Sequence, residues 1–123
     1  MNESDVAMRH RKKKIILGRE AGPRKALMKN LAQSLILHGG IRTTAAKARA
    51  MRPYVERLVT TAKSGTIAAR RSAKSKLFTE TAVKKLFTDV APKYKERAGG
   101  YTRIIKLGRR ASDAGETVRI EFV

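Results

Sequence analysis

The side chains best suited to do chemistry in this chain are its lysines and arginines. They number 29 against 10 aspartates and glutamates, which gives a net charge of +19 on 123 residues. So large an excess of one sign repels itself and opposes a compact fold unless a polyanion neutralises it. Nucleic acid is the commonest polyanion in a cell, so the composition predicts a nucleic-acid partner bound through its phosphates.

The residue types that catalysis needs form no recognisable group. Cysteine is absent, which excludes thiolate metal sites and a cysteine nucleophile. The two histidines, His10 and His38, have no carboxylate pair nearby, and the acids are scattered singly. Gly99-Gly100 lacks the spacing of a phosphate-binding loop. The sequence predicts no enzymatic activity, no metal, no cofactor and no small-molecule substrate.

No segment indicates a membrane protein. The longest apolar runs are three residues, far from the ~20 that a transmembrane helix needs. The absence of cysteine suits a reducing compartment. We expect an intracellular protein without a membrane partner.

The basic residues are spread along the chain and are not confined to one recognition helix. The N-terminal block holds Arg9, Arg11, Lys12, Lys13 and Lys14, and a C-terminal run holds Arg103, Lys106, Arg109 and Arg110. Others fall on three predicted helices. A surface that is basic on several sides fits embedding in folded RNA better than lying along one face of a duplex.

Behind these charges, apolar periodicity predicts the elements of one globular domain over 21–123, preceded by a basic arm over 1–20. The first helix begins at Pro23 and ends at His38, before two glycines. A short strand over 41–43 follows.

The second helix starts after Thr44 as N-cap and ends at Ser64-Gly65. Its apolar positions recur at helical spacing and are Met51, Val55, Leu58, Val59 and Ala62. Pro53 lies within it and predicts a kink, or a break just before the proline.

Two shorter helices follow. The third is capped by Thr66, ends near Phe78 and has few apolar anchors, namely Ile67, Ala73 and Leu77. The fourth starts at Thr79 or Thr81 and is ended by Pro92. Its apolar stripe comprises Val83, Leu86, Phe87 and Val90.

Residues 101–107 and 117–123 are rich in β-branched and aromatic residues. Asp113 and Gly115 between them supply turn chemistry, so the two segments should pair as an antiparallel hairpin. The predicted fold class is α+β: about four helices packed on a small mixed sheet that contains this hairpin and can be joined by residues 41–43.

The few aromatic residues leave one alternative open. Phe78, Phe87 and Phe122 are assigned to the core. Tyr101 follows two glycines and precedes Arg103, so its ring either stacks on an unpaired base or packs against the helices.

Several strings, taken in order, resemble the bacterial large-subunit ribosomal protein L17 family. They are MRHRK (8–12), LGR (17–19), RKALMKNLAQSL (24–35), IRTTAAKA (41–48), LVTTAK (58–63), VKKLF (83–87) and RAGGYTRI (97–104). Any one string is weak, but seven in the right order are specific. The resemblance starts at Met8, so residues 1–7 are an extra segment, and Pro23 stands where many relatives have histidine.

The resemblance implies an α+β protein of the cytoplasmic ribosome that binds 23S rRNA near the polypeptide exit tunnel, beside neighbouring large-subunit proteins. By motif, the implied RNA contacts are Arg9, His10, Arg11, Lys12, Arg19, Arg24, Thr43, Thr44, Lys47, Arg97, Tyr101 and Arg103. Basic residues near them complete the candidate set: Lys13, Lys14, Lys25, Lys106, Arg109 and Arg110.

The main alternative is a DNA-packaging or regulatory DNA-binding protein. In that case the second and third helices would form a helix-turn-helix pair. The third helix has few apolar anchors to dock it, and the basic residues are not concentrated on it. These features favour structured RNA over duplex DNA.

Overall fold

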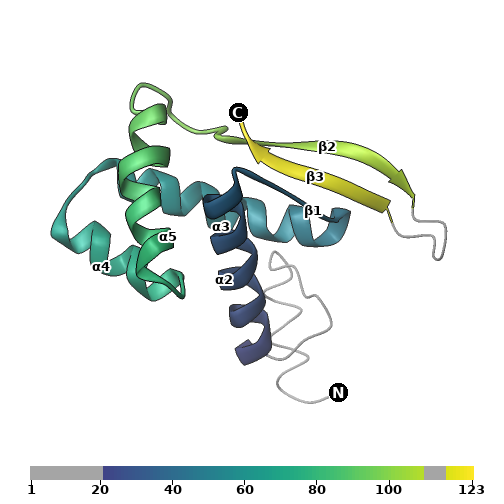
Figure 1. Cartoon of the computed structure of the whole chain (residues 1–123), viewed down its shortest axis with the longest axis horizontal. Coiled ribbons are helices and arrows are strands. Elements are labelled where there is room, and N and C mark those ends of the chain that lie inside the picture. Colours follow the sequence, from purple (N-terminus) through teal and green to yellow (C-terminus); the bar gives the residue numbers. More distant parts are fainter. Residues whose placement is uncertain (1–20, 110–115) are drawn as a thin grey trace, which may run out of the picture.

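The computed structural model describes residues 21–109 and 116–123. Its elements are, in order, α2 (Ala21–His38), β1 (Gly40–Thr44), α3 (Ala45–Lys63), α4 (Ile67–Lys76), α5 (Glu80–Lys85), β2 (Thr102–Arg109) and β3 (Glu116–Phe122). A π-helical segment, η1 (Leu86–Val90), and a 3-10 helix, η2 (Ala91–Tyr94), continue α5. Helices together with a small sheet confirm the predicted α+β class (Figure 1).

The sheet has the strand order β1-β3-β2, and both pairings are antiparallel. The predicted hairpin is therefore confirmed, as is the strand at 41–43. The expectation of a mixed sheet is wrong. β2 runs in the same direction as β1, but β3 lies between them, so no parallel pair forms among the described strands.

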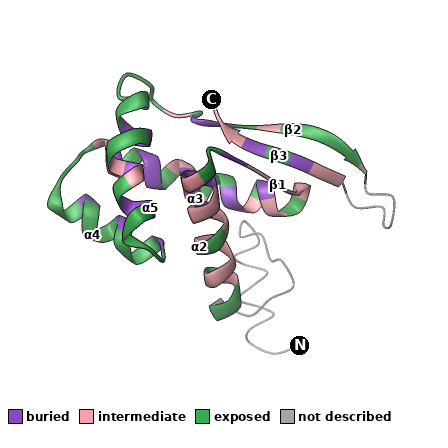
Figure 2. Cartoon of the chain, viewed as in Figure 1, coloured by how far each residue is buried: buried purple, intermediate pink, exposed green. Residues whose placement is uncertain are grey.

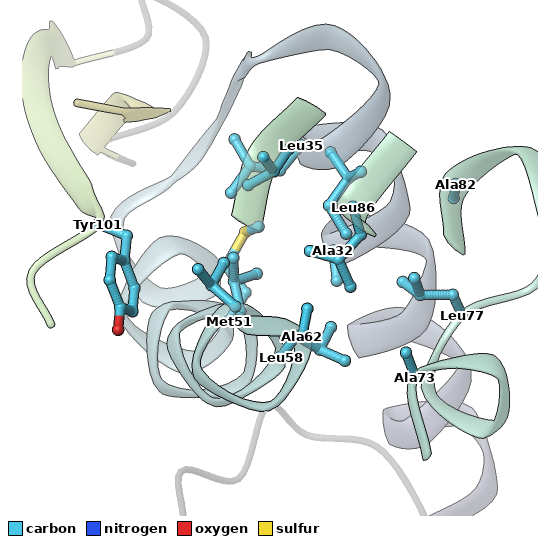
Figure 3. Packing of buried hydrophobic residues seen from close by; sticks show 14 of the residues in the cluster. Ala32, Leu35, Met51, Leu58, Ala62, Ala73, Leu77, Ala82, Leu86 and Tyr101 are labelled. Atoms are coloured by element: carbon cyan, nitrogen blue, oxygen red, sulfur yellow. The ribbon is translucent and has the colours of Figure 1, made fainter. Parts of the chain in front are cut away.

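α3 is the centre of the hydrophobic core and contacts all three strands. Its predicted apolar stripe is buried throughout: Met51, Val55, Leu58, Val59 and Ala62. Ala32 and Leu35 of α2 and Leu86 of η1 pack around this stripe (Figure 3). Val118 and Ile120 of β3 are buried in the same cluster. Each large aliphatic side chain buried there contributes about 1.5–3 kcal/mol, so α3 holds the helices and the sheet together.

The helix ends follow the predicted chemistry. Thr44, Thr66 and Thr79 cap α3, α4 and α5, and each hydroxyl accepts from the N–H three residues later, at 3.3, 3.0 and 3.3 Å. Thr79 is therefore the cap of α5, and Thr81 is not. Gly39 follows α2 with φ +79°, a conformation that glycine adopts without strain.

Neither proline interrupts its helix as predicted. α3 is continuous through Pro53, so of the two expected outcomes, a kink or a break, the break is wrong and the kink stays a prediction. Met51 and Val55 on either side are fully buried, and their packing offsets one lost hydrogen bond. Pro92 lies in the first turn of η2, where its missing N–H costs nothing, and helical winding continues to Tyr94.

Two predicted core residues are on the surface. Ile67 is 76% exposed and Phe78 is 51% exposed. α4 instead buries Ala69 and Ala73, whose small side chains let the helix approach closely, and most of its surface faces solvent (Figure 2). Phe87 and Phe122 are partly buried against the core, as predicted.

Candidate nucleic-acid interface

Part of the predicted RNA-binding set lies outside the described residues: Arg9, His10, Arg11, Lys12, Lys13, Lys14, Arg19 and Arg110. Arg109 is the last residue of β2, and the description covers its backbone alone. The other predicted residues belong to the sheet, to the starts of α2 and α3, and to the segment that leads into β2.

The sheet face turned away from the helices gathers arginines. The register aligns Arg42 of β1 and Ile105 of β2 with Arg119 of β3. Two residues further along the strands, it aligns Gly40 of β1 and Arg103 of β2 with Glu121 of β3. Val118 and Ile120 point to the helices, so these alternate residues point to solvent. Arg42 and Arg119 are directly opposite each other. Like charges in that position destabilise a strand pair, so this face favours an anionic ligand.

Glu121 organises two of these guanidinium groups. Arg119 Nε donates to Glu121 Oε1 at 2.8 Å, and Arg103 Nε donates to Glu121 Oε2 at 2.8 Å. The hydrogen bond from Arg119, and to a smaller extent the one from Arg103, lowers the pKa of the Glu121 carboxyl. Glu121 is therefore ionised at neutral pH and keeps both arginines paired. In the described part of this face, three arginines stand against one carboxylate, and the balance stays positive.

Gly40 gives Arg119 the room for this arrangement. A Cβ built on Gly40 would lie 2.2 Å from Nη2 of Arg119. The guanidinium therefore lies across the glycine of the neighbouring strand, flat against the sheet. Arg42 and Arg119 were not among the predicted contacts. The alternation in TVRIEFV, which puts Arg119 on the polar face, and the predicted strand at 41–43 were the signals that could have found them.

The far end of the hairpin is the most exposed part of the sheet, and in Figure 1 it extends past the end of α3. The Lys106 side chain is 84% exposed, with Nζ 3.8 Å from Glu116 Oε1. A pair so exposed contributes little to stability, which leaves the ammonium available to a phosphate. The register shifts between Lys106 and Gly108, and Gly108 has φ +109°. This β-bulge bends β2 near its end.

The predicted contacts at the starts of α2 and α3 lie elsewhere. Thr44 uses its hydroxyl to cap α3, and Lys47 donates its backbone N–H to it. Thr43 is aligned with buried Val118, on the helix side of the sheet. Arg24 and Lys25 belong to the first turns of α2, at the end away from the sheet (Figure 1). The structure therefore brings the predicted residues to several sides of the molecule.

Tyr101 corrects a prediction. Its side chain is fully buried and lies beside α3 (Figure 3). The ring centroid is 5.2 Å from that of Tyr94. The hydroxyl lies 3.2 Å from Thr60 Oγ1 and accepts from Lys63 Nζ at 3.1 Å. The hydrogen bond with Thr60, with help from Lys63, lowers the pKa of the Tyr101 hydroxyl despite burial. A base cannot reach this ring. Of the two alternatives for Tyr101, packing against the helices is therefore confirmed and stacking on a base is wrong.

Glu56 has a positioning role that sequence reasoning missed. Its Oε1 accepts from the N–H groups of Gly100 and Tyr101 at 3.0 and 3.3 Å. Its Oε2 accepts from the N–H and hydroxyl of Thr102 at 3.0 and 2.8 Å. One turn earlier, Arg52 Nη2 donates to the Thr102 carbonyl at 3.0 Å.

The same side of α3 holds the segment that leads into β2. Lys63 Nζ donates to the carbonyl of Arg97, whose own side chain is exposed. Arg52, Glu56, Thr60 and Lys63 recur at helical spacing, and this polar stripe was the signal available. α3 thus fixes where β2 begins, and with it the position of Arg103.

Other site chemistry has no support in the described ranges. Within 21–109 and 116–123, no three or more His, Asp or Glu side chains gather as a metal site would require. In those same ranges no helix combines the length and the apolar character needed to cross a membrane.

Residues 27–123 match the family described as Ribosomal protein L17. The large ribosomal subunit protein bL17 of Akkermansia muciniphila is 52% identical over 116 residues, covering 94% of this chain and 85% of the relative. The chain belongs to the ribosomal protein L17 family. The bL17 of Hydrogenobaculum is 52% identical over 117 residues (94% and 99% covered), and that of Desulfitobacterium hafniense is 50% identical over 107 residues (87% and 96%).

L17 family members are structural proteins of the large ribosomal subunit and not enzymes. The resemblance, the non-enzymatic role and a place in the cytoplasmic ribosome are thereby confirmed. Family membership also sets aside the DNA-binding alternative. In addition, α4, its supposed recognition helix, buries only Ala69 and Ala73 along its length.

Proposed function

We propose that this L17 family member binds 23S rRNA near the polypeptide exit tunnel, beside neighbouring large-subunit proteins. The basic arm, exposed helix faces and the hairpin supply the contacts. The proposed set keeps Arg9, His10, Arg11, Lys12, Lys13, Lys14, Arg19, Arg24, Lys25, Thr43, Thr44, Lys47, Arg97, Arg103, Lys106, Arg109 and Arg110, omits Tyr101, and adds Arg42 and Arg119.

The observation that carries the proposal is the arginine arrangement on the open sheet face. Arg42 opposes Arg119, and Arg103 lies beside them, held through Glu121. Guanidinium groups held in fixed positions match phosphate oxygens geometrically and lose little entropy when they bind. The like charges of Arg42 and Arg119 repel each other in the free protein, and a phosphate backbone lying across this face would reduce that repulsion.

Site-directed cleavage of the rRNA tests the proposed location. The chain contains no cysteine, so Lys106→Cys provides a single attachment point for an iron chelate at the exposed end of the hairpin. After reconstitution into large subunits, we expect hydroxyl-radical cuts in 23S rRNA segments that line the tunnel exit. A cysteine cross-linker at the same position should capture proteins of that region.

Two controls make this result specific. The unsubstituted chain, which cannot carry the chelate, measures background cutting. Ser72→Cys on exposed α4 should cut a different set of nucleotides, because it lies on another side of the molecule. Cuts from Lys106→Cys that do not exceed background, or that map away from the tunnel exit, would contradict the proposal.

A further inference from the structure

Phe78 presents half of its surface to solvent at a fixed place in the fold. It lies in the short turn between α4 and α5, after buried Leu77, the C-cap of α4, and before Thr79, the cap of α5. A single exposed apolar side chain needs no explanation by itself. At this position three further observations point to a ligand.

The first observation is that the backbone at Phe78 is held rigidly. Gln33 Oε1 of α2 accepts from Phe78 N at 3.0 Å, from Thr79 N at 2.9 Å and from Thr79 Oγ1 at 3.2 Å. The turn is thus tied to a helix distant in sequence. A turn whose backbone is already fixed loses little conformational entropy when a partner binds to its side chain.

The second observation is the charge around the ring. Lys29 Nζ lies over one face of the Phe78 ring, 5.2 Å from its centroid, which leaves stacking on a base to the other face. Lys25 is one turn before Lys29 on α2, and Lys76 is an exposed residue at the end of α4. Glu80 is the nearby carboxylate, and it is engaged by Arg70 Nη2 at 3.0 Å and Lys74 Nζ at 3.8 Å. The surroundings of the ring therefore attract an anion.

The third observation is that Phe78 stands alone as an apolar group. Among the described residues of the helices, the other exposed large hydrophobic residue is Ile67, at the opposite end of α4. A ten-residue helix separates the two by about 15 Å. Interfaces between proteins usually bury a contiguous apolar centre, which this arrangement does not provide.

We propose that Phe78 stacks on an unpaired base of ribosomal RNA, with Lys29 and its neighbours binding the adjoining phosphates. This inference rests on the proposed rRNA binding and names a contact within it. Every nucleobase has a π-face that an aromatic ring can cover, and a flanking ammonium group meets the phosphate of the same nucleotide.

Affinity for full-length 23S rRNA tests the stacking. We expect Phe78→Ala and Phe78→Leu to weaken binding about 5- to 150-fold, the range for loss of one stacked base. Phe78→Tyr and Phe78→Trp should bind within about twofold of the parent. None of the four should change the salt dependence, because no phosphate contact is lost. Thermal unfolding of each variant checks that the fold is kept.

Fluorescence gives an independent readout. The chain has no tryptophan, so Phe78→Trp is a unique reporter whose emission should be strongly quenched by stacking on a base. Ile67→Trp, exposed at the other end of α4, is the matched control and should change little.

Each alternative outcome has a distinct meaning. Wild-type affinity for Phe78→Ala overturns the inference, and rRNA binding itself stands. Wild-type affinity for Phe78→Leu with weak binding of Phe78→Ala indicates an apolar contact with the RNA that needs no aromatic ring, and it also overturns the inference. If the unsubstituted chain does not bind 23S rRNA, both this inference and the proposed function fall.

Discussion

At the scale of single residues, two acids of this basic protein, Glu56 and Glu121, have architectural roles. Glu56 accepts four hydrogen bonds from residues 100–102, and Glu121 spaces two arginines on the open sheet face. Glu56 thus fixes where β2 begins, and Glu121 fixes the positions of the Arg103 and Arg119 guanidinium groups.

Removing the Glu56 carboxylate should therefore cost stability. Glu56→Ala leaves the N–H groups of Gly100, Tyr101 and Thr102 without their acceptor, and Thr102 is nearly fully buried. We expect a loss of about 1–3 kcal/mol in the free energy of unfolding, measured by urea titration. Glu96→Ala removes the same charge from an exposed position and should change it by less than about 0.5 kcal/mol. Equal midpoints for the two variants would show that the Glu56 contacts are not stabilising.

At the scale of elements, local chemistry was predictable and tertiary placement was not. Threonine caps, glycine stops and the apolar stripe of α3 were all readable, because each depends on neighbours within a few residues. The path through Pro53 was not, because burial of Met51 and Val55 on both sides outweighs the local preference for a break.

The candidate site shows the same division. Charge and motif indicated the hairpin, but pairing Arg42 with Arg119 depends on strand order, which one sequence does not determine. The burial of Tyr101 and the exposure of Phe78, which are opposite to the sequence-based expectation for Phe78, have a similar cause. Both are aromatic residues beside turns, and only the packing of α3 against residues 97–102 decides that Tyr101 is the buried one.

The open sheet face carries a prediction of its own. Arg42→Ala should reduce the slope of log affinity for 23S rRNA against log salt by about one, because one phosphate contact is lost. Arg42→Lys retains the charge, so it should keep the slope and lose affinity modestly through the missing guanidinium fork. An unchanged slope for Arg42→Ala would mean that this face does not contact the phosphate backbone.

At the scale of the whole molecule, the described residues form one small hydrophobic core with cations on several of its sides. We propose that residues 21–123 form a single domain, because described residues from α2, α3, α4, α5, η1, η2 and β3 contribute to one hydrophobic cluster. The starts of α2 and α3, the sheet face and the hairpin end all present cations in different directions. A partner that neutralises them must surround the body, as folded RNA does.

The salt dependence of binding by the intact chain tests this claim most directly. Affinity for 23S rRNA should be measured across a salt series, with the unsubstituted protein throughout. If at least three phosphates are bound, log affinity should fall linearly with log salt at a slope steeper than about −2.5. An affinity that stays level as salt rises would contradict phosphate-dominated binding, and a net charge of +19 would then need a cause other than neutralisation by RNA.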